Sequence, residues 1–280
     1  MSGQGPGVGG DSGVALTDEA HQLLDSAASR DVTVRLMGGI AVRVRCPGQA
    51  DTFRRFGRQY HDVDVVAVGR HVKALRDSFA DLGYTEDSQI YVDSAGSRIV
   101  AYRPHSTSHV DVFLDDLEFC HTIPMKGRLE VDTLTLPLAD LLLQKLQIVE
   151  INRKDLIDIV VLLLEHPLGS GDEGRINTDR IAQLAADDWG MWRTMTMNID
   201  RTEQFVREST ELEEDERAQA VAHLEELRGC IDDVPKGMRW RVRAKVGDRV
   251  KWYRDVEDLR DAETGISFGV DEDGSGHEAS

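Results

Sequence analysis

The sequence has few cysteines, few aromatic residues and no long apolar run. Its three cysteines, Cys46, Cys120 and Cys230, stand far apart without paired spacing. This spacing excludes a disulfide framework or a zinc site and is typical of reduced thiols in a cytosolic protein. No stretch approaches the apolar length of a membrane span, and the Gly-rich residues 1–13 contain no apolar signal core. We therefore expect a cytoplasmic protein without a membrane partner.

The chain also lacks a positive net charge, since 51 Asp and Glu outnumber 33 Lys and Arg to give a net charge of -18. This balance argues against indiscriminate nucleic-acid binding. Much of the negative charge is local, because residues 208–216 and 271–278 are both rich in acids. We expect the Gly-rich residues 1–14 and the acidic tail, residues 261–280, to be disordered.

The first half of the 280-residue chain alternates helix-like and strand-like patterns. Expected helices cover residues 16–29, 40–45 and 71–82, the last one followed by Gly83 as a C-terminal glycine. Expected strands cover residues 32–37, 62–68 and 110–114, with a hairpin formed by 89–92 and 98–102. This alternation predicts an α+β fold with a mixed sheet flanked by helices, in a catalytic domain spanning residues 15–130.

From residue 131 the pattern becomes helical. Expected helices cover residues 138–150, 154–166, 178–186, 189–208 and 215–230, which together define a helical domain at residues 131–232. Asn152 and Asp155 supply start signals for the second of them. The helix at 138–150 is too apolar to face solvent, so we expect it to pack against the sheet domain.

Three aspartates lie in strand-like segments. Asp62 and Asp64 begin the segment 61–68, which alternates at its start and then becomes apolar, as a buried strand entering at a polar edge would. Residues two apart in a strand face the same side, so these carboxylates should lie side by side. Asp111 stands between two valines in another such segment. Clustered, partly buried carboxylates need a counter-charge, and a divalent cation such as Mg²⁺ is the obvious one.

Two glycines and two cations complete the candidate site. Gly38 and Gly39 end the apolar strand at 32–37, and without side chains they allow backbone N–H groups at the next helix start to approach a phosphate closely. Lys145, in an apolar helix, either reaches the surface or neutralises a phosphate. Arg58, four residues before Asp62, is either a surface arginine or a ligand of phosphate or of a metal-binding carboxylate.

In order and spacing, these motifs resemble the nucleotidyltransferase superfamily, which contains polymerase beta, the aminoglycoside nucleotidyltransferases and the toxin-type nucleotidyltransferases. Gly38 and Gly39 match the family's Gly-Gly or Gly-Ser turn. Asp62 and Asp64 match its Asp-x-Asp pair, and Asp111 matches its third carboxylate. Residues 141–146 and 153–158 are similar to the helical segment that follows the core in the Gly-Gly branch. The resemblance covers about residues 31–200.

The resemblance implies transfer of a nucleoside monophosphate from a triphosphate such as ATP to a hydroxyl, with release of pyrophosphate. Asp62, Asp64 and Asp111 would be the catalytic, metal-binding residues, with Mg²⁺ as the cofactor and Mn²⁺ as the alternative. Asp111 could also take the proton of the acceptor hydroxyl. Nucleotide binding would fall to a second set, namely Gly38, Gly39, Arg58 and Lys145.

Residues 238–253 alternate basic and apolar side chains around Gly247 and Asp248, which predicts a basic β-hairpin within the segment 233–260. On such a hairpin the cations share one face. That face would either contact an RNA backbone or nucleotide phosphates, or pair with the acidic residues 208–216 as a solvated surface. The cations concerned are Arg239, Arg241, Arg243, Lys245, Arg249 and Lys251.

Several functions remain open at this point. The acceptor could be RNA, as in a toxin-antitoxin-like enzyme, or a small molecule, or a protein, since all three use this core. The rival from another class is a non-catalytic protein that keeps the fold and binds a nucleotide or a partner. The presence of Asp62, Asp64 and Asp111 favours catalysis. The base, the acceptor and the oligomeric state do not follow from the sequence.

Overall fold

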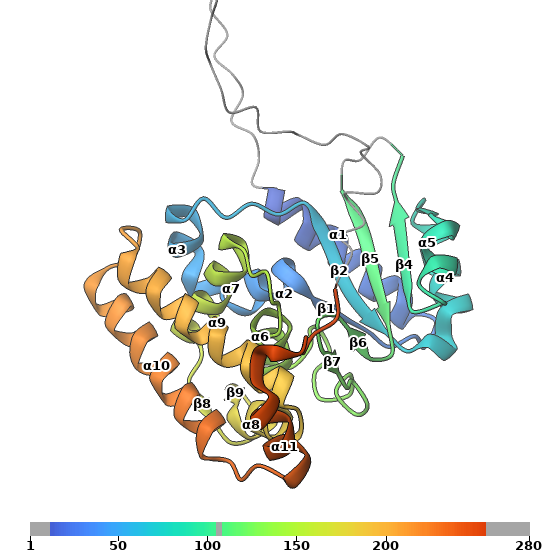
Figure 1. Ribbon diagram of the computed structural model, residues 1–280. Helices are drawn as coiled ribbons and strands as arrows, with labels where there is room; N and C mark the ends of the chain where they lie inside the picture. Colours follow the sequence, from blue (N-terminus) through green and yellow to red (C-terminus); the bar gives the residue numbers. More distant parts are fainter. Residues whose placement is uncertain (1–11, 105–107, 256–280) are drawn as a thin grey trace, which may run out of the picture.

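A computed structural model of the chain describes residues 12–104 and 108–255 (Figure 1). Its main sheet has five strands in the order β1 (Val34–Met37), β2 (Asp62–Ala67), β5 (His109–Leu114), β4 (Arg98–Tyr102) and β3 (Thr85–Glu86). β2 and β5 run parallel, whereas the other neighbours are antiparallel. The predicted α+β fold with a mixed sheet is therefore confirmed.

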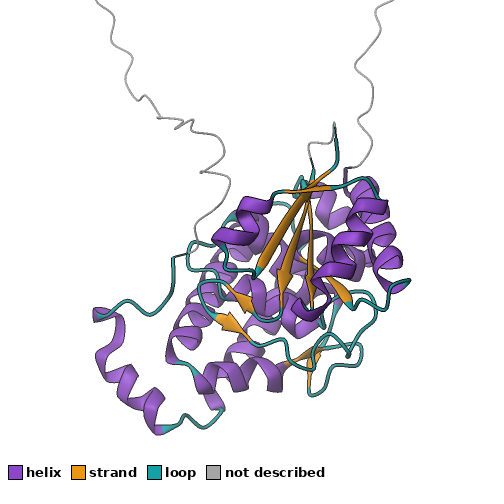
Figure 2. Cartoon of the chain, turned by 90° about the vertical axis from the view of Figure 1, so that its right-hand side faces the viewer, coloured by secondary structure: helices purple, strands orange, loops and turns teal. Residues whose placement is uncertain are grey.

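Helices cover the sheet on both sides (Figure 2). The first half contributes α1 (Ser12–Ala28), α2 (Gly38–Arg45), α3 (Ala50–Arg55), α4 (Val72–Asp81) and α5 (Ser88–Asp93). α1 packs against β1, β2 and α4. The predicted disorder at residues 1–14 and 261–280 falls mostly outside the described residues, but residues 12–14 belong to α1.

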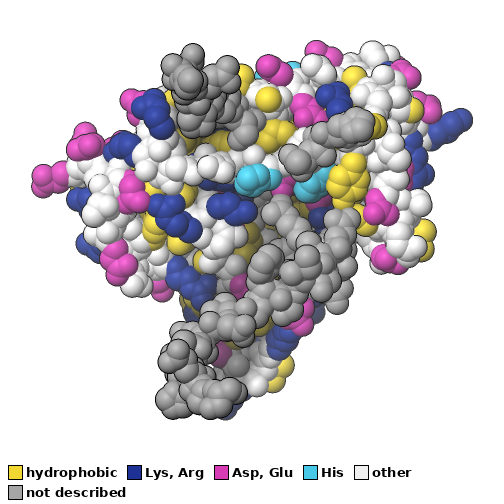
Figure 3. Space-filling model, turned by 90° about the horizontal axis from the view of Figure 1, so that it is seen from above, with side chains coloured by type: hydrophobic (Ala, Val, Ile, Leu, Met, Phe, Trp, Pro, Cys, Tyr) yellow, Lys and Arg dark blue, Asp and Glu magenta, His cyan; other side chains and the backbone are white. Residues whose placement is uncertain are grey.

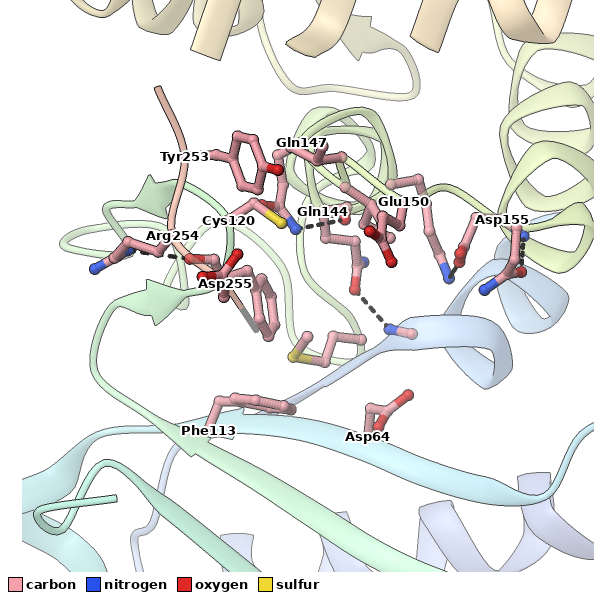
Figure 4. Close-up of a pocket in the computed structure, with 17 residues that line it drawn as sticks. Asp64, Phe113, Cys120, Gln144, Gln147, Glu150, Asp155, Tyr253, Arg254 and Asp255 are labelled. Carbon is pink, nitrogen blue, oxygen red and sulfur yellow. Dashed lines mark hydrogen bonds and ion pairs between the residues drawn. The ribbon is translucent and has the colours of Figure 1, made fainter. Parts of the chain in front are cut away.

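Alternation along β2 gives the sheet two chemically different faces. Val63 and Val65 are fully buried, while Asp62 and Asp64 are only half-buried and point to the opposite side. Asp64 rises from β2 toward the helical half of the molecule, away from the helices beneath the sheet (Figure 4). The strand start is thus polar on one face alone, as the sequence predicted.

The predicted hairpin at residues 89–92 and 98–102 is wrong in its first strand. Residues Ser88–Asp93 form the helix α5, and the second strand alone, β4, is present. The Asp87 side chain caps the helix by accepting from the N–H of Gln89 at 3.0 Å. Tyr91 lies under the Arg76 guanidinium, 4.4 Å from its ring centroid, and Val92 is exposed. An N-cap and tertiary stacking thus override a four-residue alternation.

The second half is helical, with α6 (Leu138–Leu146), α7 (Arg153–Glu165), α8 (Thr178–Asp187), α9 (Trp189–Glu208) and α10 (Glu214–Asp233). Two small ribbons accompany them, β6 (Leu117–Glu118) with β7 (Thr122–Ile123) and β8 (Leu168–Gly169) with β9 (Ile176–Asn177). Every residue of α6 is buried, as its apolar sequence predicted. Asn152 caps α7 by accepting from two backbone N–H groups.

The two halves share one hydrophobic core. Leu36 of β1 exchanges backbone hydrogen bonds with Leu134 and Leu136, so the connecting segment runs along the sheet edge. Buried residues of both halves, such as Ile40 and Leu142, belong to the same cluster. α6 is therefore held rigidly beside the sheet, with its polar residues close to β1 and β2.

The predicted C-terminal β-hairpin is also wrong. Residues Met238–Val246 form the helix α11, and Gly247, at φ +59°, ends it instead of opening a hairpin turn. Trp240 fixes the helix by packing on Trp192 at 5.2 Å between ring centroids, and its Nε1–H donates to the carbonyl of Ala185. Good helix formers and this tertiary contact outweigh the period-two pattern.

No helix in the described part of the chain combines the length and apolar character needed to cross a membrane.

Candidate functional site

Asp64 and Asp111 are neighbours across the sheet. The parallel register of β2 and β5 pairs Asp64 directly with Asp111, and Asp62 with His109. Adjacent strands lie about 4.8 Å apart, and directly paired residues face the same side, so the carboxylates of Asp64 and Asp111 meet on one face. Asp62, two residues earlier on β2, joins them on that face. The structure therefore brings together the three predicted acids.

These carboxylates repel one another. Burial raises the pKa of Asp64 well above its usual range, and the charges of Asp62 and Asp111 raise it further. Burial likewise raises the pKa of Asp111, although the Arg98 guanidinium opposes the shift. Perturbed pKa values cluster at functional sites, so this group of acids is a candidate site.

Arg98 binds Asp111 directly. Its Nε lies 2.8 Å from Oδ1 and 3.1 Å from Oδ2 of that carboxylate, and Nη2 donates to Oδ2 as well. Arg98 comes from β4, where Val100 is the direct partner of Asp111, so the ion pair crosses the strands diagonally. A basic residue in the neighbouring strand is the one sequence feature that could have indicated this contact.

The turn between β1 and α2 faces Asp64. Gly38 has φ +67°, and a Cβ at this position would stand 1.9 Å from Oδ2 of Asp64. Its N–H donates to Oε1 of Gln144 on α6 at 3.0 Å. Gly39 is packed equally closely, since a Cβ there would lie 2.5 Å from Nη2 of Arg58. The positive φ and the contact with Asp64 both require glycine at position 38, whereas a side chain at position 39 would have to displace the end of Arg58.

A cavity of about 680 Å³ opens between the sheet and α6, and Asp64 lies in its wall (Figure 4). Gly38, Gln144 and Lys145 line the side near Asp64. Gln144 is 5% exposed, and within the described residues its Nε2 finds no hydrogen-bond acceptor. A buried amide donor without an acceptor is unfavourable unless a ligand completes it. Further lining residues include Phe113, Phe119, Cys120, Glu150, Asn152, Tyr253 and Asp255.

Behind the turn lies a buried ionic cluster. Arg58 pairs with Asp158 of α7 through Nε and Nη2, at 2.9 and 3.0 Å. Lys145 contacts Asp155 at 2.8 Å and Asp158 at 3.0 Å. Because Lys145 is buried, the interpretation that it reaches the surface is wrong. Asp155 and Asp158 lie near the start of α7, and together they neutralise Arg58 and Lys145.

The cations expected on one hairpin face are dispersed by the helix. Arg239 and Arg243 line a second cavity of about 650 Å³ together with Trp189, Trp240 and Trp252. Arg243 stacks on Trp189 at 4.4 Å from the ring centroid, and it also donates to the carbonyls of Gly247 and Val250. Lys251 pairs with Asp255. The hairpin face on which the six cations were predicted to line up is therefore not formed, and Arg239, Arg243 and Lys251 instead line the second cavity.

Surface charge elsewhere is mixed. On the face seen in Figure 3, Lys and Arg side chains gather toward the middle beside histidines, and acidic side chains lie mostly toward the edge. The acidic residues 208–216 pair with one arginine from each half, since Arg55 of α3 contacts Glu216 and Arg153 of α7 contacts Glu211. The ion pair between Arg55 and Glu216 therefore joins the two halves of the molecule.

The donor set can hold a divalent ion. Mg²⁺ is typically bound by one or two carboxylates together with substrate phosphates, and Asp62 and Asp64 present two carboxylates on one face. Within the described residues, however, no group of three or more His, Cys, Asp or Glu side chains is arranged to hold a metal together. Asp62 and Asp64 thus fit a metal site, whereas Asp111 is engaged by Arg98.

Substitution of Gly38 by Ala tests the close packing of the turn. We expect loss of activity and a destabilisation of about 2 kcal/mol or more, because the new Cβ both strains the backbone and displaces Asp64. Gly83→Ala is the matched control, since Gly83 has φ +76° and no atom within 4 Å of an added Cβ. It should cost only about 1 kcal/mol and leave activity intact. Equal effects of both changes in thermal unfolding and turnover would contradict the contact with Asp64.

No protein-family model matches the chain, and no curated protein matches it. Among solved structures, the chain is similar to the solution structure of the antibiotic-resistance factor ANT(2'')-Ia, with 14% sequence identity and a TM-score of 0.37. The match covers 53% of this chain and 83% of that one. At this level of similarity the activity of the neighbour cannot be transferred, so what the site can do follows from its own residues.

Proposed function

We propose that the protein is a metal-dependent nucleotidyltransferase. The observation that carries this proposal is the contact between Asp64 and the Gly38 turn at the wall of one cavity, with Asp62 and Asp111 on the same sheet face. A carboxylate cluster can bind a cation, and a glycine turn at the start of a helix can bind a phosphate chain. Here the two lie side by side.

The chain's own residues would bind the triphosphate from two sides. Backbone N–H groups at the start of α2 would bind a phosphate there, because Gly38 lines the cavity and glycine allows close approach. Gln144 would donate its unpaired Nε2–H to a phosphate or sugar oxygen. Lys145, which lines the cavity, would add positive charge, while Arg58 supports the turn from behind. Asp62 and Asp64 would hold Mg²⁺ or Mn²⁺, which withdraws charge from the phosphates.

The reaction is an attack of an acceptor hydroxyl on the α-phosphorus. The new P–O bond forms as the bond to pyrophosphate breaks, and the hydroxyl proton must move to a base. A carboxylate of the cluster is the proposed base. Asp111 can serve once Arg98 has moved, because both of its oxygens accept hydrogen bonds from that guanidinium. The acceptor remains RNA, a small molecule or a protein.

Incubation of the protein with each α-labelled nucleoside triphosphate and Mg²⁺ tests the proposal. Total RNA, small hydroxyl compounds and cell extract serve as separate acceptor sources. We expect label transfer from one triphosphate to one class of acceptor, together with pyrophosphate release that EDTA abolishes. Nucleotide binding without transfer to any acceptor would instead favour the non-catalytic binding protein.

A further inference from the structure

We propose that Arg98 takes the place of a second cation, so that the protein binds one divalent ion, at Asp62 and Asp64, and not two. This inference rests on the proposed function, because it concerns the same carboxylate cluster. The alternative is the two-ion arrangement, in which a third carboxylate helps to hold a second ion about 4 Å from the first.

The geometry of Arg98 is that of a built ion pair. Its guanidinium donates to both oxygens of Asp111, through Nε at 2.8 and 3.1 Å and through Nη2. Such paired contacts match the planar fork of arginine to a carboxylate and are stronger than single ones. The guanidinium also lies 5.2 Å from the ring centroid of Phe113, the direct cross-strand partner of Arg98. Sheet register and an aromatic ring thus hold the cation over Asp111.

Access separates the carboxylates. Asp111 is 4% exposed, whereas Asp62 and Asp64 are half-buried, and of the three carboxylates only Asp64 lines the cavity. An ion arriving with a nucleotide in the cavity therefore meets Asp64 first. To reach Asp111 as well, it would have to displace Arg98, and an arginine cannot neutralise itself by losing its proton.

Charge points the same way. Arg98 supplies a positive charge directly at Asp111, so that carboxylate already has its counter-charge. A second divalent ion beside Asp111 would be repelled by the guanidinium until Arg98 moved.

Titration with MnCl₂ of the full-length protein, followed by electron paramagnetic resonance of free Mn²⁺, counts the ions without reference to activity. We expect one ion for the wild type and two for Arg98→Gln, in which Asp111 loses its cation. Adding Asp111→Asn to Arg98→Gln should return the count to one. Arg103→Gln is the matched control. Like Arg98 it is a partly exposed arginine of this region, but it pairs with Glu19 and stacks on Tyr84. It should bind one ion.

The outcomes distinguish this inference from the proposed function. Two ions in the wild type would overturn the inference while leaving the nucleotidyltransferase proposal standing, and this count requires no variant to fold. One ion in a folded Arg98→Gln protein would overturn it as well. If neither the wild type nor any variant bound Mn²⁺, the metal-dependent function itself would be contradicted.

Discussion

Replacement of Asp64 by Asn is expected to lower pyrophosphate release by about 10³-fold or more, because it removes the proposed metal-binding carboxylate that lines the cavity. The folded protein without metal should keep or gain stability. Burial and the charges of Asp62 and Asp111 raise the pKa of Asp64, so its ionised form opposes folding at neutral pH. Asn carries no charge and relieves that opposition.

The sign of this stability effect depends on pH. The folded state binds a proton at Asp64 more tightly than the unfolded chain, whose aspartates titrate near pH 3.9. Wild-type stability should therefore fall as the pH rises from about 4 through the raised pKa of Asp64, and the gain from Asn should vanish below about pH 4. Thermal unfolding with EDTA at pH 4 and pH 7 measures this difference.

Asp25→Asn, an exposed position on α1, is the control and should change neither activity nor stability. Retained pyrophosphate release in Asp64→Asn, together with a loss of stability at pH 7, would assign Asp64 a structural role and exclude it from metal binding.

Removal of Asp158 is expected to cause the largest loss of stability, about 3–5 kcal/mol for Asp158→Ala. This carboxylate is fully buried and neutralises Arg58 and Lys145 together. Although burial lowers the pKa of Lys145, the charges of Asp158 and Asp155 raise it above its ordinary value, so the lysine stays charged. Without Asp158, Arg58 would lose the carboxylate it pairs with, Asp155 would face two buried cations, and the turn in front of Arg58 would lose its support.

Urea unfolding of Asp158→Ala and of Glu203→Ala provides the comparison. Glu203 forms an exposed pair with Arg207 one helical turn away, and its loss should change the free energy of unfolding by less than about 0.5 kcal/mol. A change below about 1 kcal/mol in Asp158→Ala would show that the cluster does not stabilise the fold. In that case its cations would be available for substrate.

The two largest effects thus separate two neighbouring clusters of charge. One, around Asp64, is strained and faces a cavity, whereas the other, around Asp158, is neutralised and buried. Loss of function without loss of stability is expected in the first, whereas loss of stability is expected in the second. This contrast is what distinguishes a site from the framework that supports it.

The sequence by itself determined the features that local patterns encode. The start of β2 alternates two acids with buried valines, which placed Asp62 and Asp64 on one face before any fold was known. The helix predicted at residues 189–208 is present with both of its ends, and Asp188 caps its start. The turn at residue 38 was located because two consecutive glycines end the apolar strand, and Gly38 adopts φ +67°.

Only the tertiary structure decided two kinds of feature: the secondary structure of segments with short, ambiguous patterns, and the ion pairs between residues far apart in the sequence. Residues 88–93 and 238–246 alternate like strands, yet a cap at Asp87 and the packing of Trp240 on Trp192 make them helices. Arg58 pairs with Asp158, a hundred residues further along the chain, and Arg98 pairs with Asp111 on the neighbouring strand. Such ion pairs have no signature in the chain, because they depend on how closely separate elements approach when they share one core.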